Sequence, residues 1–205
     1  MTKDWAGNST AAIITTGGRN FTETEREQND YYATNPRAID LLFMRENFSK
    51  KIWEPACGEG HLSKRMEQWG KEVVSTDLIE RGFGIGGVNF LESNTPWVGD
   101  IITNPPFKFA EDFIVKALSL TNGKIAMFLR IQFLEGIGRY DRLFTKFPPA
   151  RLYVFSSRIG CGMNGDFKSH SQSAVCYAWW VWDKEHIGPP TIQWIKDEGV
   201  KEMDI

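Results

Sequence analysis

The chain has 205 residues, of which 41% are apolar, and its formal net charge is −2. This length suffices for one well-filled core, and a charge so close to zero excludes a protein that binds polyanions through its overall charge. Three widely spaced cysteines, no membrane-length apolar run and no signal-peptide pattern argue against a disulfide framework, a cysteine zinc site and a membrane span, so we expect a cytoplasmic protein without a metal site.

The N-terminal part of the chain predicts an arm followed by a helix. Residues 1–30 are polar and rich in glycine and threonine, and they lack apolar periodicity, so we expect a flexible arm. In the next stretch, Pro36 follows two capping candidates, and the apolar side chains of Ile39, Leu42 and Phe43 share one helical face. This pattern predicts a helix that begins near Pro36.

Strand and helix patterns then alternate along the chain. Amphipathic helices are expected at about 61–69 and 108–120, and a glycine-interrupted helix is expected within 133–147. The strand patterns lie within residues 50–54, 71–78, 87–93, 98–107, 123–131, 150–157, 173–183 and 190–195. Because helices separate most of the strands, the sequence predicts a doubly wound, mostly parallel, Rossmann-like α/β sheet with an antiparallel edge strand.

A glycine turn follows the first of these strands in EPACGEG (54–60). Gly58 and Gly60 flank the expected strand-to-helix junction, where missing side chains let a ligand approach the backbone and the helix start offers free N–H groups. Asp77 follows Gly58 by 19 residues, close to the ~20-residue spacing at which a carboxylate meets ribose in nucleotide-binding βαβ units. A Gly-x-Gly pair without a third glycine is also typical of a tight turn with a surface aspartate nearby.

Two glutamates at this turn favour a positively charged ligand. Glu54 precedes the bend and Glu59 lies within it, and both carboxylates would repel a pyrophosphate. S-adenosylmethionine instead carries a sulfonium and an ammonium group. We therefore interpret the turn as an S-adenosylmethionine site in which Glu54 meets the cationic end and Asp77 meets the ribose diol.

The strand within 98–107 runs into Asn104, Pro105, Pro106 and Phe107. Two consecutive prolines cannot continue a central strand, because neither has a backbone N–H to donate. An exocyclic aryl amine is a weak nucleophile, and two acceptors aimed at its hydrogens, the Asn104 side-chain oxygen and the Pro105 carbonyl, would make its nitrogen more tetrahedral. Phe107 would stack on the base. The alternative interpretation is a strand-ending turn with a buried aromatic side chain.

These motifs resemble, in their order, those of the class I S-adenosylmethionine-dependent methyltransferases that methylate amino groups, and specifically those of the small phage-type DNA adenine-N6 methyltransferases. Asn104 to Phe107 match the catalytic tetrad of that branch, and EPACGEG matches its cofactor loop. The resemblance covers about residues 31–130 and implies methyl transfer to the N6 amine of a flipped adenine in DNA, in a bacterial or phage-infected cell. The cofactor-binding residues that it implies are Tyr32, Thr34, Glu54, Ala56, Cys57, Gly58, Gly60, Asp77, Leu78, Asn89 and Phe90.

The sequence also departs from this family. Asn89 stands where an acid is usual, and Phe107 stands where Tyr is commoner. Nothing after Ile131 is long enough for a separate target-recognition domain, so we expect residues 31–205 to form one domain whose DNA specificity is loose or supplied by a partner protein. RNA bases, a protein glutamine amide and a non-catalytic S-adenosylmethionine-binding adaptor are the alternatives, and the oligomeric state stays open.

A basic segment, residues 124–170, lies in the second half of the chain. It contains eight basic and three acidic residues, an excess of five positive charges. Cationic side chains set the register and the non-specific affinity of proteins on nucleic acid. We expect phosphate contacts from Arg139, Arg142, Arg158 and Lys168; a solvated surface is the alternative.

Overall fold

The computed structural model describes residues 32–157, 159, 161–163 and 175–197, so the predicted arm at 1–30 lies outside the described residues. Seven strands form one sheet in the order β3-β2-β4-β5-β8-β6-β9. Their bounds are β2 Lys51–Glu54, β3 Glu72–Ser75, β4 Asp100–Thr103, β5 Ile125–Arg130, β6 Arg151–Phe155, β8 Tyr177–Trp182 and β9 Thr191–Ile195. Short strands with buried β-branched and aromatic side chains account for this central sheet.

The pairing of the strands confirms a mostly parallel, Rossmann-like sheet. β3, β2, β4 and β5 pair in parallel, and β6 and β9 pair in parallel as well. The antiparallel strand is β8, which pairs with β5 on one side and β6 on the other. It is therefore an inner strand, and β9, predicted from PTIQWI, forms the edge beyond it.

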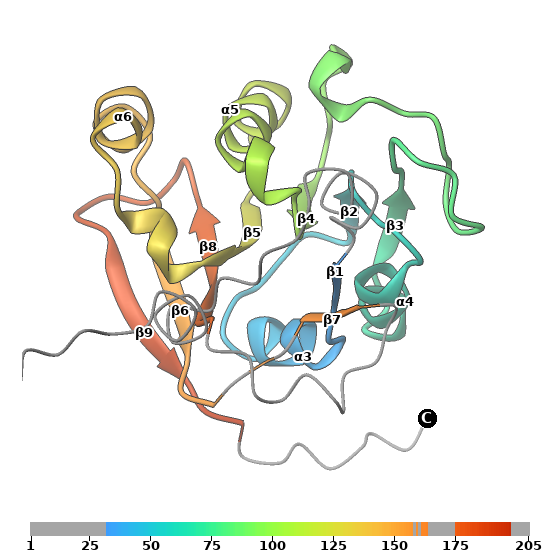
Figure 1. Cartoon of the computed structure of the whole chain (residues 1–205), viewed down its shortest axis with the longest axis horizontal. Coiled ribbons are helices and arrows are strands. Elements are labelled where there is room, and N and C mark those ends of the chain that lie inside the picture. The colour runs from blue at the N-terminus through green and yellow to red at the C-terminus, as the bar shows by residue number, and fades with distance from the viewer. Residues whose placement is uncertain (1–31, 158, 160, 164–174, 198–205) are drawn as a thin grey trace, which may run out of the picture.

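Helices cover both faces of the sheet (Figure 1). The helices α3 (Arg37–Phe43) and α4 (His61–Gln68) pack against one face, and α5 (Ala110–Leu120) packs against the other. Neighbouring residues of a strand serve opposite faces: Ile102 and Trp179 belong to the first core, and Ile101 and Trp180 belong to the second. This division confirms the doubly wound arrangement.

Two predicted elements are wrong, and glycine explains both. Residues 87–89 are not a strand: Gly82, Gly84 and Gly87 have positive φ angles, and the chain leads instead to a 3-10 turn, η1 (Phe90–Glu92). The predicted helix within 133–147 is broken near Gly136, which has a φ of 132°. The segment comprises η3 (Ile131–Leu134), α6 (Ile137–Arg139) and a π-helical turn, η4 (Tyr140–Phe144).

A second, two-stranded sheet ties the start of the described chain to its last third. The strands β1 (Tyr32–Thr34) and β7 (Cys161–Met163) pair antiparallel, with Thr34 opposite Cys161. Thr34 thereby stands on a paired strand just before α3. Within the described residues, no helix has the length and apolar character that a membrane span requires, and no cluster of three or more metal-ligating side chains occurs.

Candidate active site

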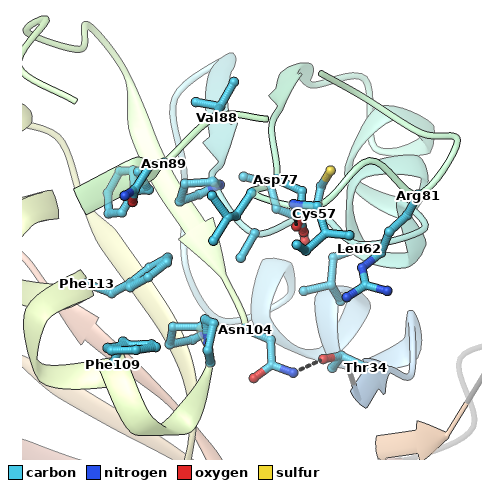
Figure 2. A pocket seen from close by; sticks show the side chains of 18 of the residues that line it. Thr34, Cys57, Leu62, Asp77, Arg81, Val88, Asn89, Asn104, Phe109 and Phe113 are labelled. Carbon is cyan, nitrogen blue, oxygen red and sulfur yellow. Dashed lines mark hydrogen bonds between the residues drawn. The ribbon is translucent and has the colours of Figure 1, made fainter. Parts of the chain in front are cut away.

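A cavity of about 420 Å³ opens where the chain leaves the carboxyl ends of β2, β3 and β4. Ligands of open α/β sheets bind at this end of the strands, and the volume lies in the range of small-molecule sites. The side chains around it come from the glycine turn, the segment after β3 and the start of α5 (Figure 2). The predicted residues among its walls are Thr34, Glu54, Ala56, Cys57, Asp77, Leu78, Asn89, Phe90, Asn104, Pro105, Pro106 and Phe107.

Asp77 is held in place by the backbone of two neighbouring segments. Its Oδ2 accepts a hydrogen bond from the Gly58 N–H at 2.8 Å, and its Oδ1 accepts one from the Ile79 N–H at 2.9 Å. Each carboxylate oxygen has further lone pairs, so both can still accept from hydroxyl groups. The carboxylate is thus fixed at the cavity wall as an acceptor pair that suits a diol.

The two glycines of the turn shape the backbone and are not themselves among the cavity walls. Gly58 and Gly60 have φ angles of 54° and 80°, where other residues are strained. A Cβ on Gly60 would lie 2.3 Å from the Phe83 ring. The φ angle of Gly60 and the packing of Phe83 against it therefore both require glycine at position 60.

Glu54 ends β2 and is almost completely buried, with an exposed fraction of 1%. Its Oε2 accepts a hydrogen bond from the Ser63 hydroxyl, which in turn lies 2.6 Å from the Ser75 hydroxyl. Burial raises the pKa of Glu54 to about 8, the Ser63 hydrogen bond opposes this shift, and the charge of Asp77 adds to it. At neutral pH the carboxyl group is mostly protonated unless a cation lies beside it.

The wall also contains the Cys57 thiol and the His61 imidazole, and neither has a pKa shift that would activate it. Burial, with the charges of Glu54 and Asp77, raises the pKa of the Cys57 thiol to about 12, so this thiol is a poor nucleophile. His61 is the first residue of α4, as expected, and burial lowers the pKa of its imidazole. Neither side chain is poised as a nucleophile or a strong base.

Asn104 follows the carboxyl end of β4 and contacts the strand β1. Its Nδ2 donates a hydrogen bond to the Oγ1 of Thr34 at 2.9 Å, and the oxygen of the amide points away from Thr34 (Figure 2). Thr34 is 3% exposed. Thr34, for which the family resemblance implies a cofactor role, thus also contacts the amide that is predicted to be catalytic.

Phe107 stands beside a cation that sequence reasoning missed. The guanidinium carbon of Arg130 lies 4.4 Å from the centre of the Phe107 ring, and Tyr177 is tilted against that ring at 6.0 Å. Arg130 is the single exposed residue of β5, after five buried ones. The sequence does contain a pattern that could have indicated Arg130: a charged residue ends an apolar strand, at the edge of a parallel sheet where ligands bind.

Part of the cavity wall is aromatic. Phe90 is buried and packs edge-on against Trp53 and at 4.9 Å from Phe113. Phe109 and Phe113, which lie within the amphipathic helix predicted at about 108–120, also line the cavity. Their second role was missed because periodicity does not distinguish a core face from a cavity wall.

Asn89 is engaged within its own turn. Its Oδ1 accepts from the Leu91 N–H at 3.1 Å, and its Nδ2 donates to Glu92 Oε1 at 2.7 Å. This cap of η1 already uses the oxygen that was expected to accept from an adenine amine. Any such contact would have to use the remaining lone pair of that oxygen.

The four basic residues expected to contact phosphate differ in what the structure shows. Arg142 forms two hydrogen bonds with the Glu111 carboxylate, at 2.8 and 3.0 Å. Arg139 donates to the carbonyls of Phe133 and Glu135 and lies over the Phe133 ring. Neither is among the cavity walls. Arg158, Lys168 and the side chain of Tyr32 lie outside the described residues.

Arg81 is a further wall residue that sequence reasoning missed. It lies in the glycine-rich stretch after β3, and its guanidinium points past Leu62 in Figure 2. The cavity therefore combines two acidic side chains, a fixed amide and a cation within an aromatic frame.

Comparisons with known proteins place the fold. No protein-family model matches the sequence, and no curated protein matches it either. Among solved structures, a Pyrococcus horikoshii protein classed as an RNA methyltransferase has a TM-score of 0.55 at 15% identity, and the match covers 86% of this chain and 98% of that one. A Vibrio vulnificus protein classed as a modification subunit of a type I restriction enzyme has a TM-score of 0.53 at 16% identity, and the match covers 95% of this chain and 54% of that one.

A third similar structure, from Listeria monocytogenes, is classed as a class I S-adenosylmethionine-dependent methyltransferase. Its TM-score is 0.51 at 12% identity, and the match covers 78% of this chain and 62% of that one. The chain thus spans 54% to 62% of the length of two of these three proteins. At these identities the likeness concerns the fold alone: this chain shares the Rossmann-like α/β fold of these three structures.

Proposed function

We propose that the protein transfers a methyl group from S-adenosylmethionine to the exocyclic N6 amine of adenine in DNA. One observation carries the proposal: Asn104 and Pro105 line the same cavity as Asp77 and Glu54. A pair of amine acceptors and a pair of acidic groups suited to a cationic nucleoside are thereby brought together at the carboxyl end of one parallel sheet.

The cofactor side of the cavity fits S-adenosylmethionine in its chemistry. The fixed carboxylate of Asp77 would accept from the ribose hydroxyls, and Phe90, Phe109 and Phe113 would surround the adenine. Glu54 would lie near the cationic end, where a positive charge favours its ionised form. When bound, the cofactor supplies an electrophilic methyl group on a sulfonium.

The substrate side explains the two prolines. Asn104 Oδ1 and the Pro105 carbonyl would each accept from one hydrogen of the amine and so localise its lone pair, while Phe107 stacks on the base. In the in-line displacement, the amine lone pair would form the new N–C bond while the methyl–sulfur bond breaks with its electrons left on sulfur, and the nitrogen would then release its extra proton to water. Positioning is the main catalytic contribution of these residues, and no strong base is required.

The choice of DNA rests on the Asn-Pro-Pro-Phe tetrad and its resemblance to the adenine-N6 branch. The similar solved structures include both a restriction-enzyme modification subunit and a protein classed as an RNA methyltransferase. The assay must therefore offer both nucleic acids. Since no separate recognition domain is expected within 31–205, we propose that a partner protein or the DNA context supplies sequence specificity.

The test incubates purified protein with methyl-labelled S-adenosylmethionine and, in turn, unmethylated DNA, RNA and protein extract. Nucleoside mass spectrometry then identifies the labelled atom. We expect label on N6 of adenine in DNA and a loss of at least about 10²-fold in turnover for Asn104→Ala, by analogy with the removal of one preorganised hydrogen-bonding group from other active sites.

The other outcomes separate the alternatives. Label on RNA or on glutamine would keep the chemistry and change the substrate. Tight cofactor binding without transfer to any of the three substrates would indicate a non-catalytic adaptor. Equal turnover for the wild type and Asn104→Ala would remove the tetrad from the mechanism.

A further inference from the structure

We propose that Thr34 is a positioning residue that sets the orientation of the Asn104 amide. This inference rests on the function proposed above, because it concerns how Asn104 meets the substrate amine. It differs from the cofactor role that the sequence resemblance implies for Thr34. The two roles predict different kinetic consequences, so they can be separated.

The contact joins two segments that are 70 positions apart in the sequence. Asn104 Nδ2 donates to Thr34 Oγ1 at 2.9 Å, and both residues line the cavity (Figure 2). Thr34 is 3% exposed, so water has little access to replace its hydroxyl as the acceptor. A hydrogen bond in such a site is stronger than one at the surface, and its loss is more costly.

The chemistry of an amide makes its orientation decisive. The oxygen and the NH₂ group of asparagine have nearly the same size, but the first accepts hydrogen bonds and the second only donates them. If the Asn104 amide turned over, its NH₂ would face the NH₂ of the substrate, and an acceptor would be lost. The Thr34 oxygen accepts from Nδ2 and therefore favours the orientation in which Oδ1 remains for the amine.

The backbone around Thr34 keeps its hydroxyl in place. Thr34 ends β1, which pairs with β7, and the next helix, α3, begins at Arg37. Its β-branched side chain has few rotamers, so the hydroxyl loses little freedom when it forms the bond. Serine could supply the same acceptor from this position, although less rigidly.

The first experiment compares Thr34→Val, Thr34→Ala and Thr34→Ser. Valine keeps the shape and removes the acceptor, so we expect kcat to fall about tenfold, as the loss of one net hydrogen bond of about 1.4 kcal/mol predicts. The Kd for S-adenosylmethionine should change less than about twofold, because Thr34 acts on the amide; a twofold change corresponds to about 0.4 kcal/mol. Serine should restore most of kcat, and alanine should behave as valine does.

Thr103 offers a matched control one residue before Asn104. Its side chain is fully buried, and its Oγ1 has no hydrogen-bond partner within the described part of the chain. Thr103→Val is therefore the same substitution at a neighbouring buried position without the contact. It should leave kcat unchanged, and thermal melting should show that all variants are folded.

A second background tests orientation directly. In Asn104→Asp both terminal atoms are acceptors, so turning the group over changes nothing. If orientation is what Thr34 supplies, Thr34→Val should cost kcat at most about twofold in this background, against about tenfold in the wild type; the difference is a coupling of about 1 kcal/mol. An equal loss in both backgrounds would contradict the proposal.

The single variants also distinguish the positioning role of Thr34 from the proposed function. Wild-type kcat in Thr34→Val, or a raised Kd for the cofactor with kcat preserved at saturation, would overturn the positioning role while the function stands. If Asn104→Ala retains full turnover as well, the proposed function itself fails. A selective loss of kcat in Thr34→Val and Thr34→Ala, rescued by serine, supports the inference.

Discussion

The cavity wall around Asp77 and the basic segment at 124–170 both contain charged side chains, yet these side chains differ in what they contact. Asp77 accepts hydrogen bonds from two backbone N–H groups and faces a cavity. Arg142 is paired with a carboxylate, and Arg139 is bound to carbonyls of its own loop. The first arrangement prepares a charge for a ligand, and the second satisfies it within the fold.

This difference reflects what a spacing and a charge count each describe. The carboxyl ends of neighbouring parallel strands meet at one sheet edge, and there Asp77, which follows β3, accepts a hydrogen bond from the Gly58 N–H, which follows β2. An excess of five positive charges over residues 124–170 says nothing about partners elsewhere, such as Glu111 on α5. Four substitutions test the contrast, from the largest expected effect to the smallest.

Asp77→Ala should weaken S-adenosylmethionine binding about 10²-fold, because it removes a charged acceptor for two hydroxyl groups, each worth roughly 1.5 kcal/mol or more. Isothermal calorimetry measures the affinity. Glu80→Gln is the matched control: Glu80 Oε1 accepts from the Gly82 N–H in the same loop, and the residue is not among the cavity walls. Unchanged affinity in Asp77→Ala would refute the ribose assignment.

Phe107→Ala should lower turnover about 10- to 50-fold while cofactor affinity stays within about twofold. Loss of base stacking, worth about 1–3 kcal/mol, is the physical reason. Steady-state kinetics with a saturating cofactor concentration measures the effect, and Phe107→Tyr serves as the control that preserves the ring. A fall in cofactor affinity with unchanged turnover would place Phe107 on the other side of the cavity.

Glu54→Gln should remove a pH dependence of stability. The pKa of Glu54 is raised to about 8 in the fold by burial, whereas the unfolded chain ionises this group near its usual value of about 4.3. Between these two pH values Glu54 keeps its proton in the folded state and loses it in the unfolded state. The folding equilibrium constant therefore falls as the pH rises, by at most about tenfold per pH unit. Chemical unfolding from pH 5 to 8 should show this slope in the wild type and a shallower one in Glu54→Gln.

Arg142→Gln should have the smallest effect. Its ion pair with Glu111 is 65% exposed on the arginine side, and exposed pairs contribute about 0–1 kcal/mol to stability. We expect DNA affinity to change less than about twofold and the salt dependence to stay unchanged, since a lost phosphate contact would reduce the salt slope by about one. A reduced slope would show that DNA draws Arg142 away from Glu111.

Much of the fold was predictable because it is local. Apolar runs and helix periodicity located the seven strands of the main sheet and the helices α3, α4 and α5 within a few residues. The errors arose at glycines, where backbone conformation interrupts a pattern that is otherwise regular. The inner position of β8 was not predictable from spacing, because a hairpin connection and a crossover can bring the same strand to different places.

The candidate site was predictable where its residues follow parallel strands, and not where contacts cross the molecule. Asn104 and Asp77 share the predicted cavity. Three contacts depend on three-dimensional packing. Asn104 bonds to Thr34, Arg130 stacks on Phe107, and the Phe83 ring fills the space that a side chain at position 60 would need. No short-range pattern encodes them, because each joins segments from different elements.

The neutral carboxyl group at Glu54 has a thermodynamic consequence for ligand capture. A cation that settles beside a buried acid favours its ionised form, so occupation of this end of the cavity by the sulfonium compound would release a proton to the medium. The heat of cofactor binding measured near pH 7 would then vary with the ionisation enthalpy of the buffer. The apparent affinity for the cofactor would also rise with pH, up to the pH at which Glu54 is already ionised in the protein without ligand.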